Sequence, residues 1–316
     1  MLTHQELIEA VPNALEHVNL TGFGTKFTGK VRDMYHHNGS RILITTDRIS
    51  AFDVVLGTIP FKGQALNQLS AWWFAQTKDI VPNHVLSVPD ENVTVAREAQ
   101  PLPVEVIVRG FITGVTKTSL WSLYESGMRE AYGIKLPDGL RKNDALVEPI
   151  ITPTTKAEAG GHDERLTRTE ILERGLVTPA IWEQVERVAV ALFKRGQEIA
   201  RAAGLMLVDT KYEFGLIDGQ LVLIDEMHTP DSSRYWTLES VELDPSNPKN
   251  FDKEFLREWF VMRGYKGDGV PPVMPPEFVA QVAARYIAAY EKLTGLEFVP
   301  GVLPANARIQ KNLEQF

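Results

Sequence analysis

Apolar and polar residues alternate along the chain with two different periods, which predict where strands and helices lie. Residues 22–50 alternate like paired strands, with "HNGS" as a turn between two of them. Residues 102–114 predict a further, mostly apolar strand. Apolar residues recur at helical spacing in residues 66–80 and 179–204, and again in two later stretches. Strands that dominate early and helices that follow favour an α+β fold with two lobes and a cleft between them.

Residues 137–163 interrupt both periods. They are rich in proline, glycine, threonine and charged residues, and "KNDALVEPIITPTTKAEAGGHDE" is too polar for a regular element. We therefore predict a long loop here. A loop of this length within a compact domain is usually functional or disordered.

Residues 207–236, "LVDTKYEFGLIDGQLVLIDEMHTPDSSRYW", carry the most chemical information. Asp209, Lys211 and Glu213 occupy every second position, so their side chains lie on one face of a strand. The neighbouring residues that we expect to be buried are Val208, Tyr212 and Phe214. The charged row therefore faces something other than the core. Water is the usual case, and a cleft that holds a metal and an anionic ligand is the alternative.

The turn of this hairpin decides which side chains meet, because a shift of one residue moves every side chain to the other face. A two-residue turn at Asp218-Gly219 places Glu213 on the face of Ile224 and Glu226. An odd turn in the same place sets Glu213 opposite Asp225. Mg²⁺ commonly takes one or two carboxylates plus substrate phosphates, so the second register would suit a metal site.

The composition limits the partners. The 316 residues carry a net charge of −8, which argues against a nucleic-acid or anionic-membrane partner. The chain has no cysteine, which excludes disulfides, thiolate catalysis and cysteine metal sites and favours a reducing compartment. No apolar run approaches the roughly 20 residues that span a bilayer, and the N-terminal residues lack a signal-peptide pattern. We expect a cytoplasmic protein.

Two further signals are weak when each is taken alone. Lys30 follows Gly29 in a turn where backbone amides and a lysine could approach a phosphate, but an ordinary hairpin turn explains the pattern about equally well. Arg109 ends an apolar strand, where its planar fork could clamp phosphate or carboxylate. Such an arginine is more often a surface charge.

Several segments together resemble the SAICAR synthetases, the phosphoribosylaminoimidazole-succinocarboxamide synthases of purine biosynthesis. They stand in the family's order from Gly29 to Trp259 and cover most of the chain. The segments are "GKVRD", "TTDRISAFD", "EVIVRGFITG", "KNDA", "TPTTKAE", "LVDTKYEFG", "IDEMHTPDSSRYW" and "DKEFLREW". The length and the "TPTTKAE…HDE" insertion are similar to the longer, yeast-like branch rather than the compact bacterial form.

The resemblance implies an ATP-dependent ligase. Such an enzyme joins the carboxylate of carboxyaminoimidazole ribonucleotide (CAIR) to the amine of L-aspartate and cleaves ATP to ADP and phosphate, through an acyl phosphate. It also implies an antiparallel-sheet lobe that covers the nucleotide, related to kinase and ATP-grasp architectures, and a larger α+β lobe with C-terminal helices. We expect these lobes to be residues 1–107 and 108–316, and the protein to be a monomer that uses Mg²⁺.

The resemblance implies site residues as well. Glu213 and Asp225 would hold Mg²⁺, and Lys211 and Asp209 would take part in catalysis. The expected ATP-binding residues are Lys30, Val31, Arg32, Leu102, Glu105 and Lys142. The expected ribonucleotide-binding residues are Arg109, Ser119, Asp231, Ser233, Arg234 and Arg257, with Thr116 or Thr118 as alternatives to Ser119.

The implied metal pair favours one hairpin register over the other. With Glu213 and Asp225 as ligands, we expect an odd or bulged turn that sets both on one face and Glu226 on the other. Two rival functions remain at this point. One is a small-molecule kinase with the same lobes and metal, and the other is a non-catalytic nucleotide-binding regulator. A regulator would not need both a metal pair and a phosphate-binding lysine such as Lys30.

Overall fold

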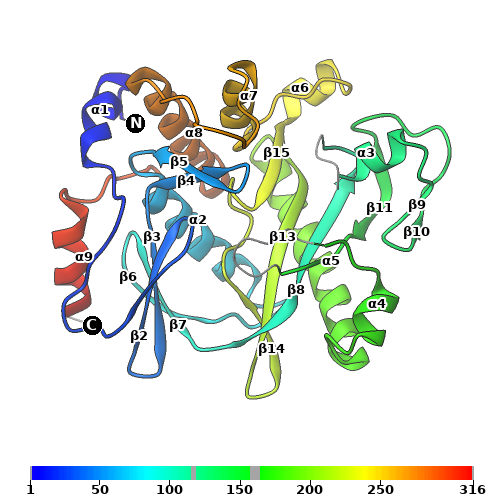
Figure 1. Cartoon of the computed structure of the whole chain (residues 1–316), viewed down its shortest axis with the longest axis horizontal. Helices are drawn as coiled ribbons and strands as arrows, with labels where there is room; N and C mark the ends of the chain where they lie inside the picture. The colour runs from blue at the N-terminus through cyan, green and yellow to red at the C-terminus, as the bar shows by residue number, and fades with distance from the viewer. Residues whose placement is uncertain (1, 115–118, 157–163, 315–316) are drawn as a thin grey trace.

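The computed structural model describes residues 2–114, 119–156 and 164–314. Its strands form two main antiparallel sheets with helices packed around them (Figure 1). The small sheet has the strand order β1 (Lys26–Thr28), β2 (Arg32–His37), β3 (Ser40–Thr45), β7 (Val93–Arg97) and β6 (Val85–Asp90). The turn between β2 and β3 lies at Asn38 and Gly39, which both have positive φ, as the sequence predicted.

The large sheet has the order β11 (Ala145–Ile151), β8 (Gln100–Phe111), β13 (Leu205–Ile217) and β14 (Gln220–Ile224). Two more strands extend it, β12 (Thr154–Thr155) on β8 and β15 (Ser233–Thr237) on β13. Two short hairpins stand apart from both sheets, β4 (Arg48–Ala51) with β5 (Val54–Thr58) and β9 (Glu130–Ala131) with β10 (Ile134–Lys135). The mixture of antiparallel sheets and helices confirms the predicted α+β fold.

The β13–β14 hairpin closes with a two-residue turn. Glu213 pairs with Ile224 without any shift of register along the hairpin. Asp218 and Gly219 have φ of 52° and 76°, the combination that an Asp-Gly type I′ turn requires, and its twist matches that of the flanking strands. The expected odd or bulged turn is therefore wrong.

Part of the predicted loop at residues 137–163 is an edge of the large sheet. β11 and β12 both pair with β8, although the pairing of β11 is interrupted between Ala145 and Ile150. The strand carries Glu148 and Pro149 on a largely exposed edge, which is where sheets tolerate a proline and charge. The prediction of a segment without regular elements is thus wrong for residues 145–151 and 154–155.

The helices cover the sheets from several sides. They are α1 (His4–Ala10), α2 (Lys62–Thr77), α3 (Leu120–Glu125), α4 (Arg168–Glu173), α5 (Pro179–Ala202), α6 (Leu238–Leu243), α7 (Glu254–Met262), α8 (Pro276–Thr294) and α9 (Ala305–Glu314). The amphipathic α5 begins with Thr178 as its N-cap and is followed by Gly204 at φ 71°. It packs on the large sheet against β13, β8 and β11.

α2 lies between the two sheets and is buried on nearly every side. Trp73 in this helix is fully buried, and α2 packs on α8 and on strands of the small sheet. Backbone bonds also tie the sheets together, since Leu223 N donates to Pro82 O at 2.9 Å and His84 N donates to Leu223 O at 3.2 Å. The apolar residues of α2 belong to the main core together with the large sheet, whereas buried residues of the small sheet such as Ile42 and Ile44 form a second cluster.

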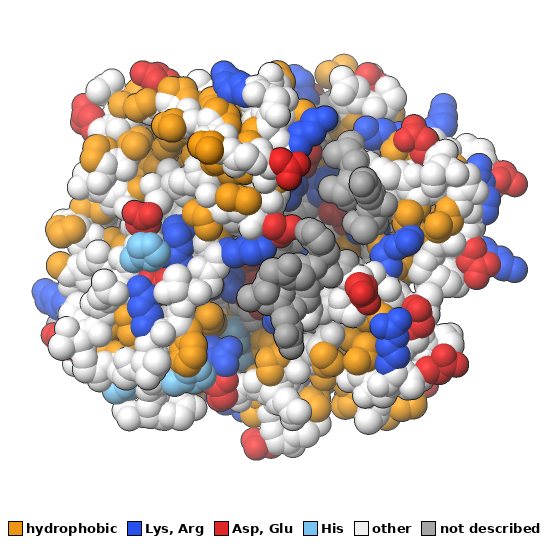
Figure 2. All heavy atoms as spheres, viewed as in Figure 1, with side chains coloured by type: hydrophobic (Ala, Val, Ile, Leu, Met, Phe, Trp, Pro, Cys, Tyr) orange, Lys and Arg blue, Asp and Glu red, His pale blue; other side chains and the backbone are white. Residues whose placement is uncertain are grey.

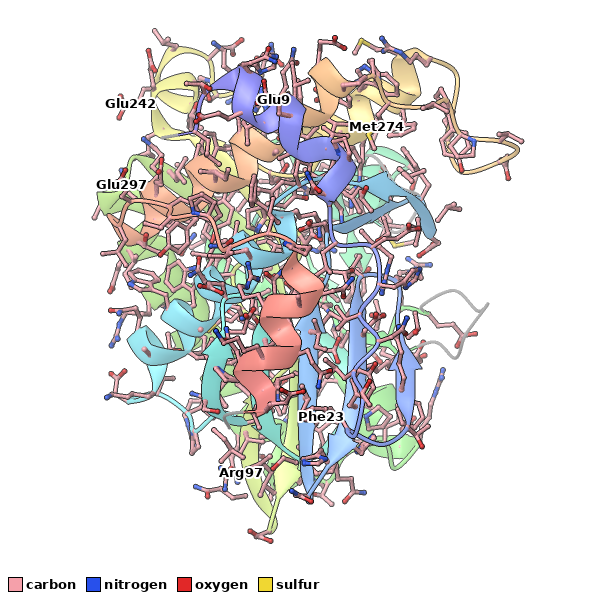
Figure 3. All side chains as sticks on the ribbon, turned by 90° about the vertical axis from the view of Figure 1, so that its left-hand side faces the viewer. Glu9, Phe23, Arg97, Glu242, Met274 and Glu297 are labelled. Carbon is pink, nitrogen blue, oxygen red and sulfur yellow. The ribbon has the colours of Figure 1, made fainter. Side chains whose placement is uncertain are left out.

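The C-terminal helix α9 returns to the small sheet. Its Ile309 and Leu313 pack with Phe23 and Tyr35 in a separate apolar cluster, and Figure 3 shows α9 lying across this sheet with Phe23 near its lower end. The division into residues 1–107 and 108–316 stays a prediction. Position 107 lies inside β8, all of which belongs to the large sheet.

Within the described ranges, no helix is both long and apolar enough to cross a membrane.

Candidate active site

The ammonium group of Lys211 is the point on which several carboxylates converge. Lys211 Nζ donates to Glu213 Oε1 at 2.5 Å, and it lies 3.4 Å from Asp225 Oδ2 and 3.5 Å from Glu105 Oε1. Burial alone would lower the pKa of Lys211, but the charges of Asp225, Glu213 and Glu105 outweigh burial and raise that pKa well above its usual value. Lys211 is therefore a fixed positive charge.

Asp225 reaches this cluster through an unusual backbone conformation. It directly follows β14 and has φ 69°, in the left-handed region that aspartate tolerates better than most residues. That conformation breaks the strand alternation, so Asp225 turns toward Lys211 despite the two-residue turn. Glu226 Oε2 lies 3.5 Å from Arg32 Nη2, and Arg32 also pairs with Asp225. The expectation that Glu226 points away from Asp225 is therefore wrong.

The cluster carries an excess of negative charge. Burial alone would raise the pKa of Asp225, but the charges of Arg32 and Lys211 outweigh burial and lower it. Lys156 donates to the other carboxylate oxygen of Glu213, Oε2. Four carboxylates thus share three cations; the carboxylates are Glu105, Glu213, Asp225 and Glu226, and the cations are Arg32, Lys156 and Lys211.

This donor set fits Mg²⁺ bound together with phosphate groups. In the described part of the chain, no group of three or more His, Cys, Asp or Glu residues is arranged to hold a metal by itself. Mg²⁺ does not need such a cage, because it is usually bound by one or two carboxylates plus substrate phosphates and water. Glu213 and Asp225, which both contact Lys211, supply carboxylates of this kind.

A second centre lies two residues earlier on β13. Asp209 Oδ2 accepts hydrogen bonds from Arg234 Nη1 at 2.8 Å and from Arg109 Nη1 at 3.1 Å. Arg109 Nε also donates to Thr152 Oγ1 at 2.9 Å. One carboxylate therefore orients two guanidinium groups, each with a planar fork suited to phosphate or carboxylate.

A third centre surrounds Asp231. Its Oδ1 accepts from Tyr286 OH at 2.5 Å and its Oδ2 lies 2.9 Å from Lys62 Nζ. Lys253 Nζ lies 3.5 Å from Oδ1. Burial alone would raise the pKa of Asp231, but the charges of Lys253 and Lys62 outweigh burial and lower it.

The arginine and Asp231 centres open into one hollow of about 280 Å³. Seven of the predicted residues line it, namely Arg109, Asp209, Lys211, Asp231, Ser233, Arg234 and Arg257. Buried Asp252 also lines it, held by the backbone N–H groups of Tyr235 and Glu254, and burial raises the pKa of Asp252 to about 7. The structure thus collects most of the predicted ribonucleotide and catalytic residues in one place.

A larger hollow of about 670 Å³ adjoins the first, and Arg234, Lys253 and Arg257 line both. Lys30 and Lys142 are on its wall, with Lys30 Nζ 2.8 Å from Asp53 Oδ1. In the space-filling view, Lys and Arg side chains gather in the middle of the face between the two halves of the molecule (Figure 2). Anionic ligands would meet a local positive potential here despite the net charge of −8.

Three predicted residues lie outside both these hollows and the charged cluster around Lys211. Ser119 is buried and caps α3, where its Oγ accepts from Ser122 N. Its alternatives, Thr116 and Thr118, lie outside the described residues. The carbonyl of Val31 accepts from the backbone N–H and the hydroxyl of Thr46, and Leu102 is part of the core.

Several charged residues of the cleft were missed at the sequence level. Lys156 and Lys253 stand inside the segments "TPTTKAE" and "DKEFLREW" that carried the resemblance, but no role was given to either. Lys62 was missed entirely, although a lysine at the start of an otherwise buried helix is a detectable signal. Burial of a lysine nearly always requires a partner, and here the partner comes from a distant loop.

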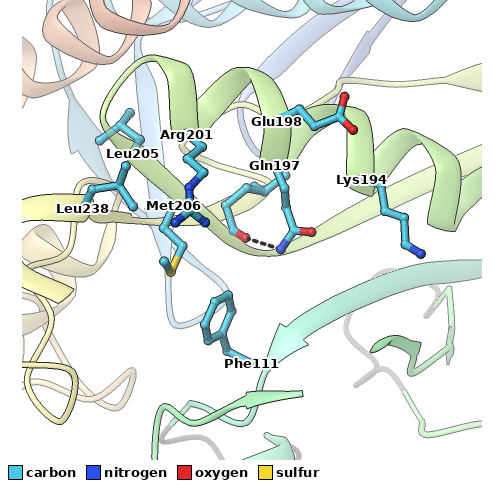
Figure 4. Close-up of a pocket in the computed structure, with 9 residues that line it drawn as sticks. Phe111, Lys194, Gln197, Glu198, Arg201, Leu205, Met206 and Leu238 are labelled. Atoms are coloured by element: carbon cyan, nitrogen blue, oxygen red, sulfur yellow. Dashed lines mark hydrogen bonds between the residues drawn. The ribbon is translucent and has the colours of Figure 1, made fainter. Parts of the chain in front are cut away.

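Another hollow lies apart from these charged centres. It measures about 320 Å³ and is bordered by α5 and by Phe111, Met206 and Leu238 (Figure 4). Its lining residues include none of the predicted site residues among those that the structure describes.

Comparison with known proteins identifies the family. The model of the SAICAR synthetase family matches residues 25–272. The chain belongs to the SAICAR synthetase family. The phosphoribosylaminoimidazole-succinocarboxamide synthase of Legionella pneumophila (strain Lens) is 49% identical over 304 residues, which cover 93% of this chain and 96% of the relative. The chloroplastic synthase of Arabidopsis thaliana is 46% identical over 319 residues, 97% of this chain and 77% of the relative.

Solved SAICAR synthetase structures have the same fold. A structure described as SAICAR-synthase from Saccharomyces cerevisiae complexed with SAICAR has a TM-score of 0.80 at 32% identity, and the match covers 91% of this chain and all of that one. A SAICAR synthetase from Pyrococcus horikoshii has a TM-score of 0.64 at 22% identity, which shows the fold alone. Family membership confirms the predicted function, the ATP-dependent ligation of CAIR and L-aspartate in purine biosynthesis.

Proposed function

We propose that this cleft performs the ligation through an acyl phosphate and that β13 aligns the two reacting anions. The observation that carries the proposal is the order of centres along one strand. Asp209 orients two arginines, Lys211 follows, and Glu213 belongs to the carboxylate cluster. Alternate residues of a strand lie about 7 Å apart on the same face, so an anion held by the arginines and one held at the cluster would meet near Lys211.

Lys211 has the central electrostatic role in this proposal. The CAIR carboxylate and the γ-phosphate of ATP repel each other, and a fixed ammonium between them lowers the energy of their approach. Because neighbouring carboxylates raise its pKa, Lys211 would act as a charge and not as a proton acceptor. Asp209 would act through Arg109 and Arg234, which would hold anionic groups of the ribonucleotide.

Glu213 and Asp225 would hold Mg²⁺ together with the phosphates of ATP. When bound, the metal supplies positive charge that neutralises the phosphoryl oxygens and favours in-line transfer. Lys30 and Lys142 would contact phosphates of the nucleotide, Glu105 would border the metal, and Leu102 would lie on the side of the adenine.

The proposed chemistry has two steps. A carboxylate oxygen of CAIR attacks the γ-phosphorus of ATP, which forms the acyl phosphate and releases ADP. The deprotonated amine of aspartate then attacks the acyl carbon, and the bond to the phosphate oxygen breaks, which releases inorganic phosphate. Activation is needed because a carboxylate oxygen is a poor leaving group.

A coupled assay for ADP tests this function. Sustained ADP formation should require ATP, CAIR and L-aspartate together, and should stop when either co-substrate is left out. Sustained ADP formation without aspartate would indicate a kinase instead. ADP formation that does not depend on CAIR would contradict the ligase.

Two further expectations remain proposals. The cysteine-free composition favours a cytoplasmic location, although the name of the Arabidopsis relative assigns that protein to the chloroplast. We also propose that the protein is a monomer.

A further inference from the structure

Asp231 is shared by two ammonium groups of different exposure. Both carboxylate oxygens already have close partners, since Oδ2 is 2.9 Å from Lys62 Nζ and Oδ1 accepts from Tyr286 OH at 2.5 Å. Lys253 Nζ lies farther away, 3.5 Å from Oδ1. Two ammonium groups therefore share the charge of Asp231. Burial lowers the pKa of Lys253, and the charges of Asp231 and Glu226 act against burial.

The position of Lys62 decides where that charge is available. The Lys62 side chain is 0% exposed and lies at the first turn of α2, so no ligand in the cleft can reach it. A buried ammonium is costly unless it is paired, which gives Lys62 its role as the counter-ion of Asp231. Of the two ammonium groups, Lys253 is therefore the one that a ligand in the cleft can reach.

Lys253 also stands where two ligands would meet. It lines both the 280 Å³ hollow and the 670 Å³ hollow. Its neighbours on this shared wall have close carboxylate partners, since Arg234 Nη1 donates to Asp209 at 2.8 Å and Arg257 Nη1 donates to Glu254 at 2.8 Å. Of these three cations, Lys253 has the longest carboxylate contact, at 3.5 Å.

We propose that Lys253 binds a carboxylate of the substrate L-aspartate. Lys62 is then a positioning residue, because it neutralises Asp231 and leaves the ammonium group of Lys253 available for the substrate. This inference rests on the proposed function. The two arginines that share Asp209 offer planar forks suited to the ribonucleotide's phosphate or carboxylate. A single ammonium at the junction matches a monoanionic carboxylate whose amine must reach the acyl carbon. Aspartate is the substrate with such a group.

The first experiment measures steady-state kinetics of Lys253→Gln. The Michaelis constant for L-aspartate should rise roughly ten- to a hundred-fold, the size expected for one charge-assisted hydrogen bond, while the constants for CAIR and ATP stay within about twofold. Lys249→Gln is the matched control, because Lys249 is exposed on the same segment, and it should behave as wild type. An equal or larger rise for CAIR would overturn the proposal and assign Lys253 to the ribonucleotide.

Substrate analogues make the assignment sharper. L-Asparagine lacks the β-carboxylate and L-isoasparagine lacks the α-carboxylate. One of the two analogues lacks the carboxylate that Lys253 contacts, and with that analogue wild type and Lys253→Gln should have the same kcat/KM. With the other analogue, the difference in kcat/KM between the two proteins should remain. A difference that persists at full size with both analogues would overturn the proposal.

The positioning role of Lys62 is tested with a variant that removes its charge and a second variant that also removes the charge of Asp231. Lys62→Met should raise the Michaelis constant for aspartate, because Lys253 would then become the main counter-ion of Asp231. Adding Asp231→Asn in the same chain should restore aspartate affinity at least in part, since it removes the charge that holds Lys253. A double variant that thermal melting shows to be folded, and that binds aspartate no better than Lys62→Met, would contradict the role of Lys62.

Should wild-type protein form no SAICAR, the proposed function itself would fail, independently of these variants.

Discussion

At the scale of single residues, the site is built from charges that share partners. Asp209 orients two arginines, and Lys211 contacts three carboxylates. Sharing lets one side chain position several others and leaves part of the charge for a ligand. A substitution at a shared residue should therefore change ligand binding more than a substitution in an isolated pair.

Asp225→Asn should reduce turnover on the order of 10²-fold, the size typical for loss of one electrostatic contact in an active site. The amide keeps the size of the side chain but removes the charge that would bind Mg²⁺ in competition with water. The measurement is kcat as a function of Mg²⁺ concentration, with circular dichroism to show that the fold survives. Glu148→Gln is the control, since its carboxylate is 72% exposed and pairs with Lys194 on the surface. Near-normal activity of Asp225→Asn at limiting Mg²⁺ would refute the ligand assignment.

Arg234→Lys should raise the Michaelis constant for CAIR by about tenfold, which corresponds to one lost charge-assisted hydrogen bond. Lysine keeps the charge but cannot both donate to Asp209 and present a planar fork to the ribonucleotide. Arg168→Lys provides the comparison, because Arg168 pairs with Glu186 at the surface. An unchanged constant for CAIR would place Arg234 outside the ribonucleotide pocket.

At the scale of elements, β13 is the part that the sequence predicted best. Its period of two indicated a charged face opposite a buried one, and Val208, Tyr212 and Phe214 are indeed almost fully buried. The expected metal pair, Glu213 and Asp225, gave the wrong register for the pairing of β13 with β14. The type I′ turn at Asp218-Gly219 fixed it, and the left-handed φ of Asp225 then brought that residue to the cluster.

Gly219→Ala should lower the free energy of unfolding by roughly 1 kcal/mol, because an L-residue with a side chain is strained at φ 76°. Open space around the position means that no clash adds to this strain. Activity should persist, since pairing with Glu105 on β8 also fixes Glu213. Urea unfolding measures the change, and Asp218→Asn should be nearly neutral because asparagine tolerates positive φ. A fully stable Gly219→Ala would contradict the two-residue turn.

The edge strand β11 was missed for a different physical reason. Hydrophobic alternation is produced by a buried face, and most residues of β11 are exposed or only partly buried. Its charged and proline residues suit an edge, so the local composition is that of a loop. The pairing with β8 arises from tertiary structure and leaves little trace in the local pattern.

At the scale of the whole molecule, contacts between distant segments complete the structure. Lys62 and Asp231 form a buried ion pair between distant parts of the chain, and α9 packs on the small sheet near the chain's beginning. Local patterns contain no information on such pairs. The family resemblance supplied most site residues but assigned no role to Lys62 or Lys253, whose importance follows from charge balance in three dimensions.

Arg308→Met should destabilise the protein by about 3 kcal/mol, as expected when a buried ion pair loses one partner. Arg308 donates from Nε and Nη2 to the two oxygens of Asp90 at 2.9 and 3.1 Å, and the side chain of Asp90 is fully buried. Chemical denaturation measures the loss. Arg174→Met, which removes a half-exposed arginine from surface pairs, should cost less than about 1 kcal/mol. Equal effects of the two substitutions would contradict a role for Arg308 in fastening α9.

The acyl phosphate is tested most directly by following one oxygen atom. CAIR labelled with ¹⁸O in both carboxylate oxygens is incubated with the enzyme, ATP, Mg²⁺ and L-aspartate, and the released phosphate is examined by mass spectrometry. Transfer of the γ-phosphoryl group to the carboxylate predicts one ¹⁸O in each phosphate, with the second label retained in the amide of SAICAR. Unlabelled phosphate would contradict the mechanism.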